Sequence, residues 1–222
     1  MREASNPRVQ AGAVGLVLIA FACLDSWLRA PGWATQGFAS HDVAGISYNG
    51  MLLLRGELPY VHSVELKAPL TFYLAALVHG VKGGVGVESV ASLIHLANAV
   101  ATAALLALVA MAARVWGLAS AIVVGGVYVG FAGVLDSMDA NYVTWANALG
   151  VFAMLTAWEA ARRGRVRLWL LVGLLAGLAA MAKRPLGVVV VAALYWAYVG
   201  AEEHRRRALS FVVGGAVMSH LP

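Results

Sequence analysis

The chain has 222 residues, of which 61% are hydrophobic and 12% are charged. Its apolar residues form runs longer than the core helices of a soluble domain require, so the composition excludes an ordinary soluble protein and predicts a polytopic membrane protein. The formal net charge of +5 comes largely from short basic segments, such as ArgArgGlyArgValArg at 162–167. Because Lys and Arg in short loops set membrane orientation, we expect no nucleic-acid partner.

The first apolar run, residues 11–28, follows Arg2 and Arg8 and has a poor small-residue cleavage pattern at its end. It is therefore predicted to be an uncleaved first transmembrane helix. Asp25 lies near its outer end and is expected to face the same pocket as the outer loops, because ionisable groups in membrane helices face the protein interior or a cavity.

The remaining apolar runs lie at 70–81, 88–113, 115–135, 143–160, 168–182, 186–200 and 208–221. If every run crossed the membrane with the N-terminus inside, 5 Lys and Arg would lie inside and 11 outside. The run 70–81 is too short to span a hydrocarbon core of about 30 Å. Leaving it at the outer surface gives 10 inside and 6 outside, as the positive-inside rule requires.

This threading predicts an all-α, polytopic membrane protein with about seven transmembrane helices and a cytoplasmic N-terminus. Residues 1–222 form a single domain, and residues 29–86 form a long first outer loop with interfacial helices. Outer segments at 136–141 and 183–185 lie on the same face. Small residues at 173–177 predict close contact between helices.

An amphipathic helix is predicted at 41–57, lying along the membrane surface. Its polar residues (Asp42, Ser47, Asn49 and Arg55) are expected on faces other than that of its apolar residues (Val43, Ile46, Met51, Leu52, Leu53 and Leu54). Gly56 suits a left-handed helix end, and Pro59 prevents the helix from continuing.

Several ionisable side chains of the outer segments have two interpretations that the sequence leaves open. Asp42 is either an N-cap or a catalytic carboxylate. Lys67 either contacts lipid headgroups or holds the phosphate of a lipid-linked substrate. Lys183 and Arg184 lie on the outer side, against the positive-inside trend, beside Pro185, and they too could neutralise a phosphate.

A divalent cation stays open as a cofactor. Asp136 and Asp139 lie close together in the second outer segment, and four side chains are available from the first: His41, Asp42, His62 and Glu65. Carboxylates and imidazoles are suitable ligands. However, no metal-ligand spacing is present, and exposed loop carboxylates are usually solvated, so no metal-ligating residue is assigned.

Five segments carry a resemblance to a known family: Asp42, TyrAsnGly at 48–50, LeuLeuLeuArgGlyGluLeuProTyr at 52–60, LysAlaProLeu at 67–70 and AlaGlyLeuAlaAlaMetAlaLysArgPro at 176–185. Together they resemble the GT-C superfamily of membrane glycosyltransferases, in the branch of protein mannosyltransferases and aminoarabinose transferases. The resemblance covers about residues 11–200. The family's conserved module also has seven transmembrane helices.

The resemblance implies an inverting hexosyl or pentosyl transferase that acts at the outer face of a bacterial inner (plasma) membrane, in the cell envelope. It implies a polyprenyl-phosphate-linked sugar as donor and a lipid, glycan or protein as acceptor. It also implies roles for six residues: a general base, Asp42; a second acid, Asp139; and substrate-binding groups, Tyr60, Lys67, Lys183 and Arg184.

Family members usually continue with more helices, so the resemblance implies that the C-terminal part of the family lies outside this chain. An alternative function is therefore a non-catalytic membrane subunit or scaffold that retains a truncated GT-C fold, with a protein partner supplying the missing part. A transporter is less consistent with the sequence, because the runs 115–135, 168–182 and 186–200 contain no charge.

Overall fold

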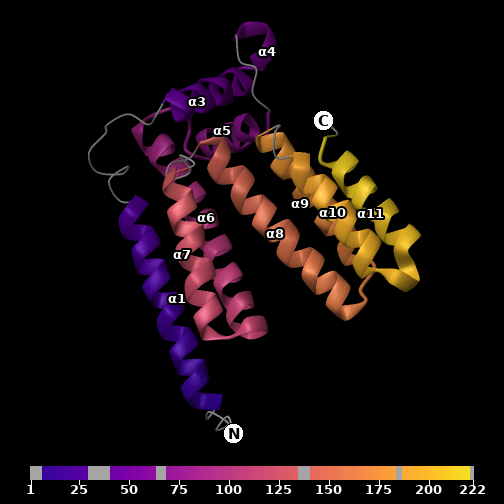
Figure 1. Ribbon diagram of the computed structural model, residues 1–222. Coiled ribbons are helices and arrows are strands. Elements are labelled where there is room, and N and C mark those ends of the chain that lie inside the picture. Colours follow the sequence, from indigo (N-terminus) through magenta and orange to yellow (C-terminus); the bar gives the residue numbers. More distant parts are fainter. Residues whose placement is uncertain (1–6, 30–40, 64–68, 135–140, 184–186, 221–222) are drawn as a thin grey trace, which may run out of the picture.

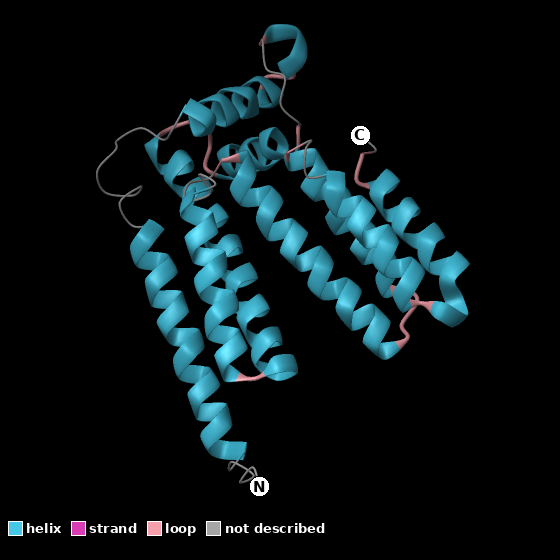
Figure 2. Ribbon diagram, in the orientation of Figure 1, coloured by secondary structure: helices cyan, strands magenta, loops and turns pink. Residues whose placement is uncertain are grey.

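The computed structural model describes residues 7–29, 41–63, 69–134, 141–183 and 187–220. Within these ranges every regular element is a helix, which confirms the predicted all-α fold (Figure 2). The longer helices are α1 (Pro7–Arg29), α3 (His41–Leu54), α5 (Leu70–Val81), α6 (Val87–Trp116), α7 (Leu118–Val134), α8 (Tyr142–Arg163), α9 (Leu168–Ala182), α10 (Val188–Gly200) and α11 (Arg205–Met218). Two short helices are α4 (Pro59–His62) and the 3₁₀ turn η2 (Glu202–His204).

The long helices run back and forth between two ends of the molecule (Figure 1). Helices α1, α6 and α7 form one group, and α8 to α11 form a second group beside it. Helices α3, α4 and α5 gather at one end, which we call the α3–α5 end. The end of α7, the beginning of α8 and the end of α9 also lie there, whereas α1 begins at the opposite end.

Two helices among the described residues are long and apolar enough to cross a membrane by length and composition, namely Gln10–Arg29 and Val87–Trp116. Shorter apolar helices occupy Leu70–Val81, Leu118–Ala132, Leu168–Ala182 and Val188–Gly200. The helices therefore support a membrane location, while the threading with seven spans stays a prediction. The bounds of α5 and α9 coincide with the apolar runs that the sequence showed.

Helix α3 ends at Leu54, before the end of the predicted helix 41–57, and Gly56 has the left-handed conformation that the sequence predicts. Gly56 adopts a φ of 74°, in the left-handed region that glycine tolerates without a Cβ penalty. The N–H of Gly56 donates to the carbonyl of Leu53 at 3.0 Å, and the N–H of Glu57 donates to the carbonyl of Leu52 at 2.9 Å. These two bonds form a Schellman motif, which satisfies the last carbonyls of the helix and turns the chain toward α4.

The predicted polar faces of α3 are wrong in part, because α3 is packed on more than one side. Ser47 and Asn49 are 5% and 2% exposed, although the sequence pattern placed them away from the apolar face. Beside them, an ideal Cβ on Gly50 would lie 2.7 Å from the Cβ of Ala75, so α3 and α5 approach closely at this glycine. Tertiary contacts with α5 thus bury a polar face that periodicity alone assigns to the surface.

Helices α9 and α11 pack backbone against backbone, as the small residues at 173–177 predict. An ideal Cβ on Gly173 would lie 2.1 Å from the carbonyl oxygen of Val212, and one on Gly215 would lie 2.2 Å from that of Leu170. Only glycine permits such an approach. The dispersion contacts of close backbones favour association of helices in a membrane.

A buried ion pair joins α1 to α6. Arg29 Nε donates to Asp25 Oδ2 at 2.9 Å, and both side chains are at most 1% exposed. From α6, the Thr102 hydroxyl donates to Asp25 Oδ2 at 2.5 Å, and Asn98 Oδ1 accepts from Arg29 Nη1 at 3.4 Å. Asp25 therefore faces the protein interior at α6, as expected of an ionisable group in a membrane helix. The outer segment that follows Arg29 lies outside the described residues, so the expected place of Asp25 beside an outer pocket stays a prediction.

Candidate functional site

A buried apolar cluster holds the α3–α5 end together. It draws on five helices, with Val43 and Ile46 from α3, Phe72 and Ala75 from α5, Leu93 and Ala97 from α6, Tyr142, Trp145 and Ala146 from α8, and Ala182 from α9. Val43 directly follows Asp42, and Ala182 directly precedes Lys183. The cluster thus brings these two candidate site residues, which lie far apart in the sequence, to the same end of the fold.

Asp42 lies in the first turn of α3, one position after the helix begins at His41. Its side chain is half-buried, beside the fully buried Val43. Because the helix begins before Asp42, the carboxylate interacts with the positive N-terminal end of the helix rather than occupying the predicted N-cap position. The arrangement holds an anionic side chain at a fixed place on the edge of the cluster.

Lys183 is the C-cap of α9 and has extended backbone angles, with φ −148° and ψ 114°. Its N–H donates to the carbonyl of Ala179 at 3.0 Å, which fixes the backbone, and its side chain is half-buried. A cation at a helix C-terminus is electrostatically favourable. The structure therefore places an ammonium group at the α3–α5 end.

Three of the predicted site residues lie outside the described residues: Lys67, Asp139 and Arg184. Their assignments to the site therefore stay predictions from the sequence. Asn141, the last residue of the outer segment 136–141, caps α8. Its Oδ1 accepts from the N–H groups of Val143 at 2.9 Å and Thr144 at 3.1 Å.

Tyr60 begins a row of three aromatic side chains. Its ring, 48% exposed on α4, lies 6.1 Å from that of Phe72, and Phe72 contacts Tyr142 edge to face at the same centroid distance. Such pairs add specific geometry to apolar burial. The row runs from the surface at α4 to the first residue of α8, so it presents an aromatic face with a polar phenol at the candidate site.

Helix α4 is fixed to α3 by a polar contact that the sequence analysis did not single out. The Ser63 hydroxyl donates to Asn49 Oδ1 at 2.6 Å and also lies against the carbonyl of Pro59. Asn49 in turn donates from Nδ2 to the carbonyl of Gly45 at 2.9 Å. This network sets the position of Tyr60, which the short helix α4 carries.

Several buried polar atoms near the cluster have no hydrogen-bond partner among the described residues: Ser47 Oγ, Thr71 Oγ1, both ring nitrogens of His79 and Trp145 Nε1. Buried polar groups are normally satisfied by protein or by water. Burial lowers the pKa of His79 below its ordinary value, so this side chain is neutral at physiological pH. Sequence reasoning missed these groups because their burial depends on packing between α3, α5 and α8.

Within the described ranges, no group of three His, Cys, Asp or Glu side chains lies close enough together to hold a metal ion. Asp136, Asp139 and Glu65 lie outside those ranges. A divalent cation at this end therefore stays a prediction from the sequence.

The model of one protein family, described as dolichyl-phosphate-mannose-protein mannosyltransferase, matches residues 66–219. This stretch is well over half of the 222 residues. The chain belongs to the dolichyl-phosphate-mannose-protein mannosyltransferase family. No curated protein and no solved structure matches the chain.

Membership of the dolichyl-phosphate-mannose-protein mannosyltransferase family confirms the resemblance to GT-C glycosyltransferases. The family implies a membrane glycosyltransferase that uses a lipid-linked sugar donor. Lys67 and Lys183 lie inside the matched stretch, whereas Asp42 and Tyr60 precede it. The assignment of the family is thus independent of the residues before 66 that carried part of the resemblance.

Proposed function

We propose that the chain is the catalytic membrane module of an inverting glycosyltransferase, which moves a sugar from a polyprenyl-phosphate donor to a hydroxyl group of a lipid, glycan or protein. The reaction takes place at the α3–α5 end, which the count of basic residues assigns to the outer face. One observation carries the proposal: Val43 and Ala182, the neighbours of Asp42 and Lys183, pack in the same buried cluster.

The chemistry needs an anion and a cation at one place. The Asp42 carboxylate takes the proton of the acceptor hydroxyl while the hydroxyl oxygen attacks the anomeric carbon of the sugar. The bond from that carbon to the phosphate oxygen breaks, and polyprenyl phosphate leaves with the bonding electrons. Lys183, with Lys67 and Arg184, stabilises the charge that develops on the phosphate.

The aromatic row supports the same assignment. A sugar ring has apolar C–H faces and polar edges, and Tyr60 offers both an aromatic face and a hydroxyl group. Its exposed fraction of 48% leaves it accessible to a substrate, while Phe72 fixes its inner side. Tyr60 is therefore assigned to sugar binding rather than to packing.

The proposal is tested with the purified chain in lipid, a radiolabelled polyprenyl-phosphate sugar and an acceptor hydroxyl, with release of polyprenyl phosphate as the readout. General-base catalysis contributes typically 10²–10⁴-fold, so Asp42→Asn is expected to lower kcat by about that factor while donor binding persists. Glu57→Gln removes a carboxylate beyond the opposite end of α3 and is the matched control. Equal rates for both variants would exclude Asp42 as the base.

Lys183→Gln separates binding from chemistry. It is expected to raise KM for the donor, whereas Lys82→Gln, which removes an exposed lysine after α5, is expected to leave KM unchanged. The alternative function, a non-catalytic subunit, predicts a different result: no transfer by the purified native chain with any donor, and co-purification with a partner in fixed stoichiometry.

A further inference from the structure

An apolar groove with a volume of about 720 Å³ lies between the two groups of helices. Its walls come from α6 and α7 on one side and from α8 and α10 on the other. No charged side chain lines it within the described part of the chain. The volume lies in the range of pockets that hold single ligands, about 300–1,000 Å³.

The groove runs along the helices from Ala146, a member of the buried cluster at the α3–α5 end, to Trp158 near the opposite end. On α8 its lining extends from Ala146 to Trp158, a distance of about 18 Å at about 1.5 Å per residue. Half of a hydrocarbon core of about 30 Å is about 15 Å. The groove is therefore long enough to give an acyl chain, which fills about one leaflet, continuous apolar contact.

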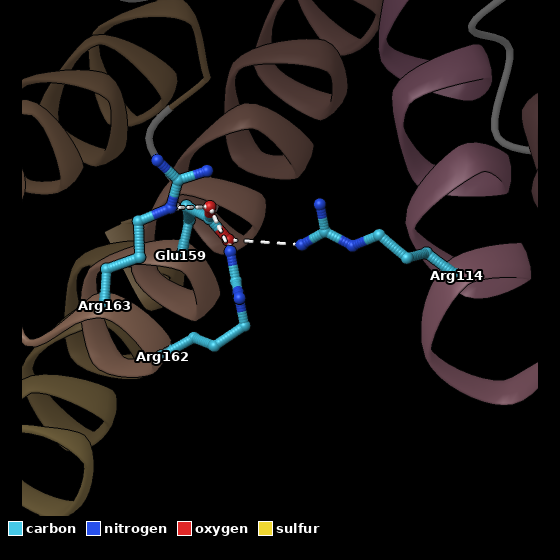
Figure 3. Close-up of polar contacts among 4 residues, drawn as sticks. All are labelled: Arg114, Glu159, Arg162 and Arg163. Atoms are coloured by element: carbon cyan, nitrogen blue, oxygen red, sulfur yellow. Dashed lines mark hydrogen bonds and ion pairs between the residues drawn. The ribbon is translucent and has the colours of Figure 1, made fainter.

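Four charged residues lie beside the far end of this groove, and Figure 3 shows them as sticks. Arg114 at the end of α6 reaches across to Glu159 on α8, with 3.3 Å between Nη2 and Oε2. Arg162 donates to the same carboxylate from Nε at 2.9 Å and from Nη2 at 2.8 Å, and Arg163 also pairs with it. Three guanidinium groups thus surround one carboxylate, which leaves an excess of two positive charges.

The arginine side chains are accessible to a ligand. The Arg114 side chain is 59% exposed. Its Nη2 donates to Glu159, and its Nε and Nη1 groups have no acceptor among the described residues. A guanidinium carries five N–H donors in a planar fork that matches phosphate oxygens. The cluster therefore keeps unused donors for an anion.

The groove and the charged cluster meet at three tryptophans. Trp158 directly precedes Glu159, and its ring lies 6.3 Å from that of Trp116 and 6.2 Å from that of Trp196. All three line the groove. Trp158 Nε1 is buried and has no acceptor within the described ranges. Indole groups favour the boundary between hydrocarbon and headgroups, so the three tryptophans suit the polar end of a bound lipid beside Glu159.

We propose that this groove binds one anionic phospholipid, with an acyl chain between α7 and α8 and its phosphate on Arg114, Arg162 and Arg163. Basic pockets between transmembrane helices favour anionic headgroups for this reason. A polyprenyl-phosphate donor that serves the α3–α5 end would place its phosphate at the other end of the helices. The phosphate position of the lipid site is therefore separate from that of the proposed donor site and does not depend on the proposed function.

The test measures binding of single phospholipids to the purified full chain by native mass spectrometry, with phosphatidylglycerol and phosphatidylcholine of the same acyl chains. Phosphatidylglycerol is expected to bind at least about tenfold more tightly, a difference of about 1.4 kcal/mol. Arg114→Gln is expected to reduce this preference several-fold. Arg206→Gln removes an exposed arginine from the first turn of α11 and is expected to leave it unchanged.

Glu159→Gln separates lipid binding from a purely structural role of the cluster. Removing the competing carboxylate frees the three arginines, so phosphatidylglycerol is expected to bind more tightly. If the cluster only tied α6 to α8, the same variant would weaken the fold and the binding together. Phosphatidylglycerol with a brominated acyl chain should also quench tryptophan fluorescence. The quenching is expected to be stronger in the native chain than in Trp158→Phe.

Three results would overturn the proposal. The first is equal affinity for the two phospholipids. The second is an equal reduction of the preference for phosphatidylglycerol in Arg114→Gln and Arg206→Gln. The third is full competition by inorganic phosphate at low millimolar concentration, because this would show a simple anion site without a bound lipid.

Discussion

The contact between α9 and α11 allows a sharp comparison of two neighbouring glycines. An ideal Cβ on Gly215 would lie 2.2 Å from the carbonyl oxygen of Leu170 and 2.6 Å from the backbone nitrogen of Leu174. The first distance is about 1.2 Å short of the 3.4 Å at which ordinary contact begins. Both atoms belong to backbone, so no side chain can rotate away. An ideal Cβ on Gly214, by contrast, meets nothing within 4 Å.

Gly215→Ala is therefore expected to destabilise the fold, and Gly214→Ala is expected to be neutral or stabilising. Both variants gain the helix propensity of Ala over Gly, about 1 kcal/mol. Only Gly215→Ala adds overpacking, which costs typically about 1–3 kcal/mol. The difference in unfolding free energy between the two variants is expected to be of that size.

The assay is reversible unfolding of the purified chain in mixed micelles of detergent and SDS, followed by circular dichroism. The two variants differ in one methyl group at adjacent positions, so effects of expression and detergent cancel. Equal unfolding free energies for both variants would refute the close approach of α9 and α11.

Three further predictions use the same unfolding assay. Asn141→Ala removes the side-chain cap of α8 and is expected to cost about 0.5–2 kcal/mol. Gly56→Ala places a Cβ at a positive φ, and because the site is open, backbone strain alone is expected to lower the free energy of unfolding by about 1–2 kcal/mol. Gly12→Ala, at an open site in α1 without a positive φ, is expected to cause no loss. Asp25→Asn removes the carboxylate that pairs with buried Arg29 and is expected to cost about 3–5 kcal/mol; an unchanged stability would contradict the buried pair.

Features that depend on local sequence could be predicted. The apolar runs match the bounds of α5 and α9, because uninterrupted helices end where the apolar residues end. Gly56 is recognisable as the residue after the end of α3, since a left-handed position selects glycine. The small residues at 173–177 predict close packing, although they do not identify the partner helix, α11.

Features that depend on contacts between distant segments could not be predicted. Ser47 and Asn49 are polar, so periodicity assigns them to the surface, but α5 and Ser63 bury them. Asp25 has its countercharge on its own helix, and the spacing alone does not show that α6 supplies the other partners of the pair.

For the candidate site, the sequence predicts that the outer segments converge. The structure brings Asp42 and Lys183 to the same end through their neighbours in the buried cluster. Their roles in catalysis stay predictions.

The pair between Asp25 and Arg29 also bears on how the chain enters a membrane. The two side chains lie four residues apart on α1, so they can neutralise one another as soon as α1 is helical. Their partners on α6, Asn98 and Thr102, are synthesised only later. The apolar stretch Gln10–Arg29 of α1 can therefore be inserted without net charge, and its polar side then gives α6 a position at which to dock during biogenesis.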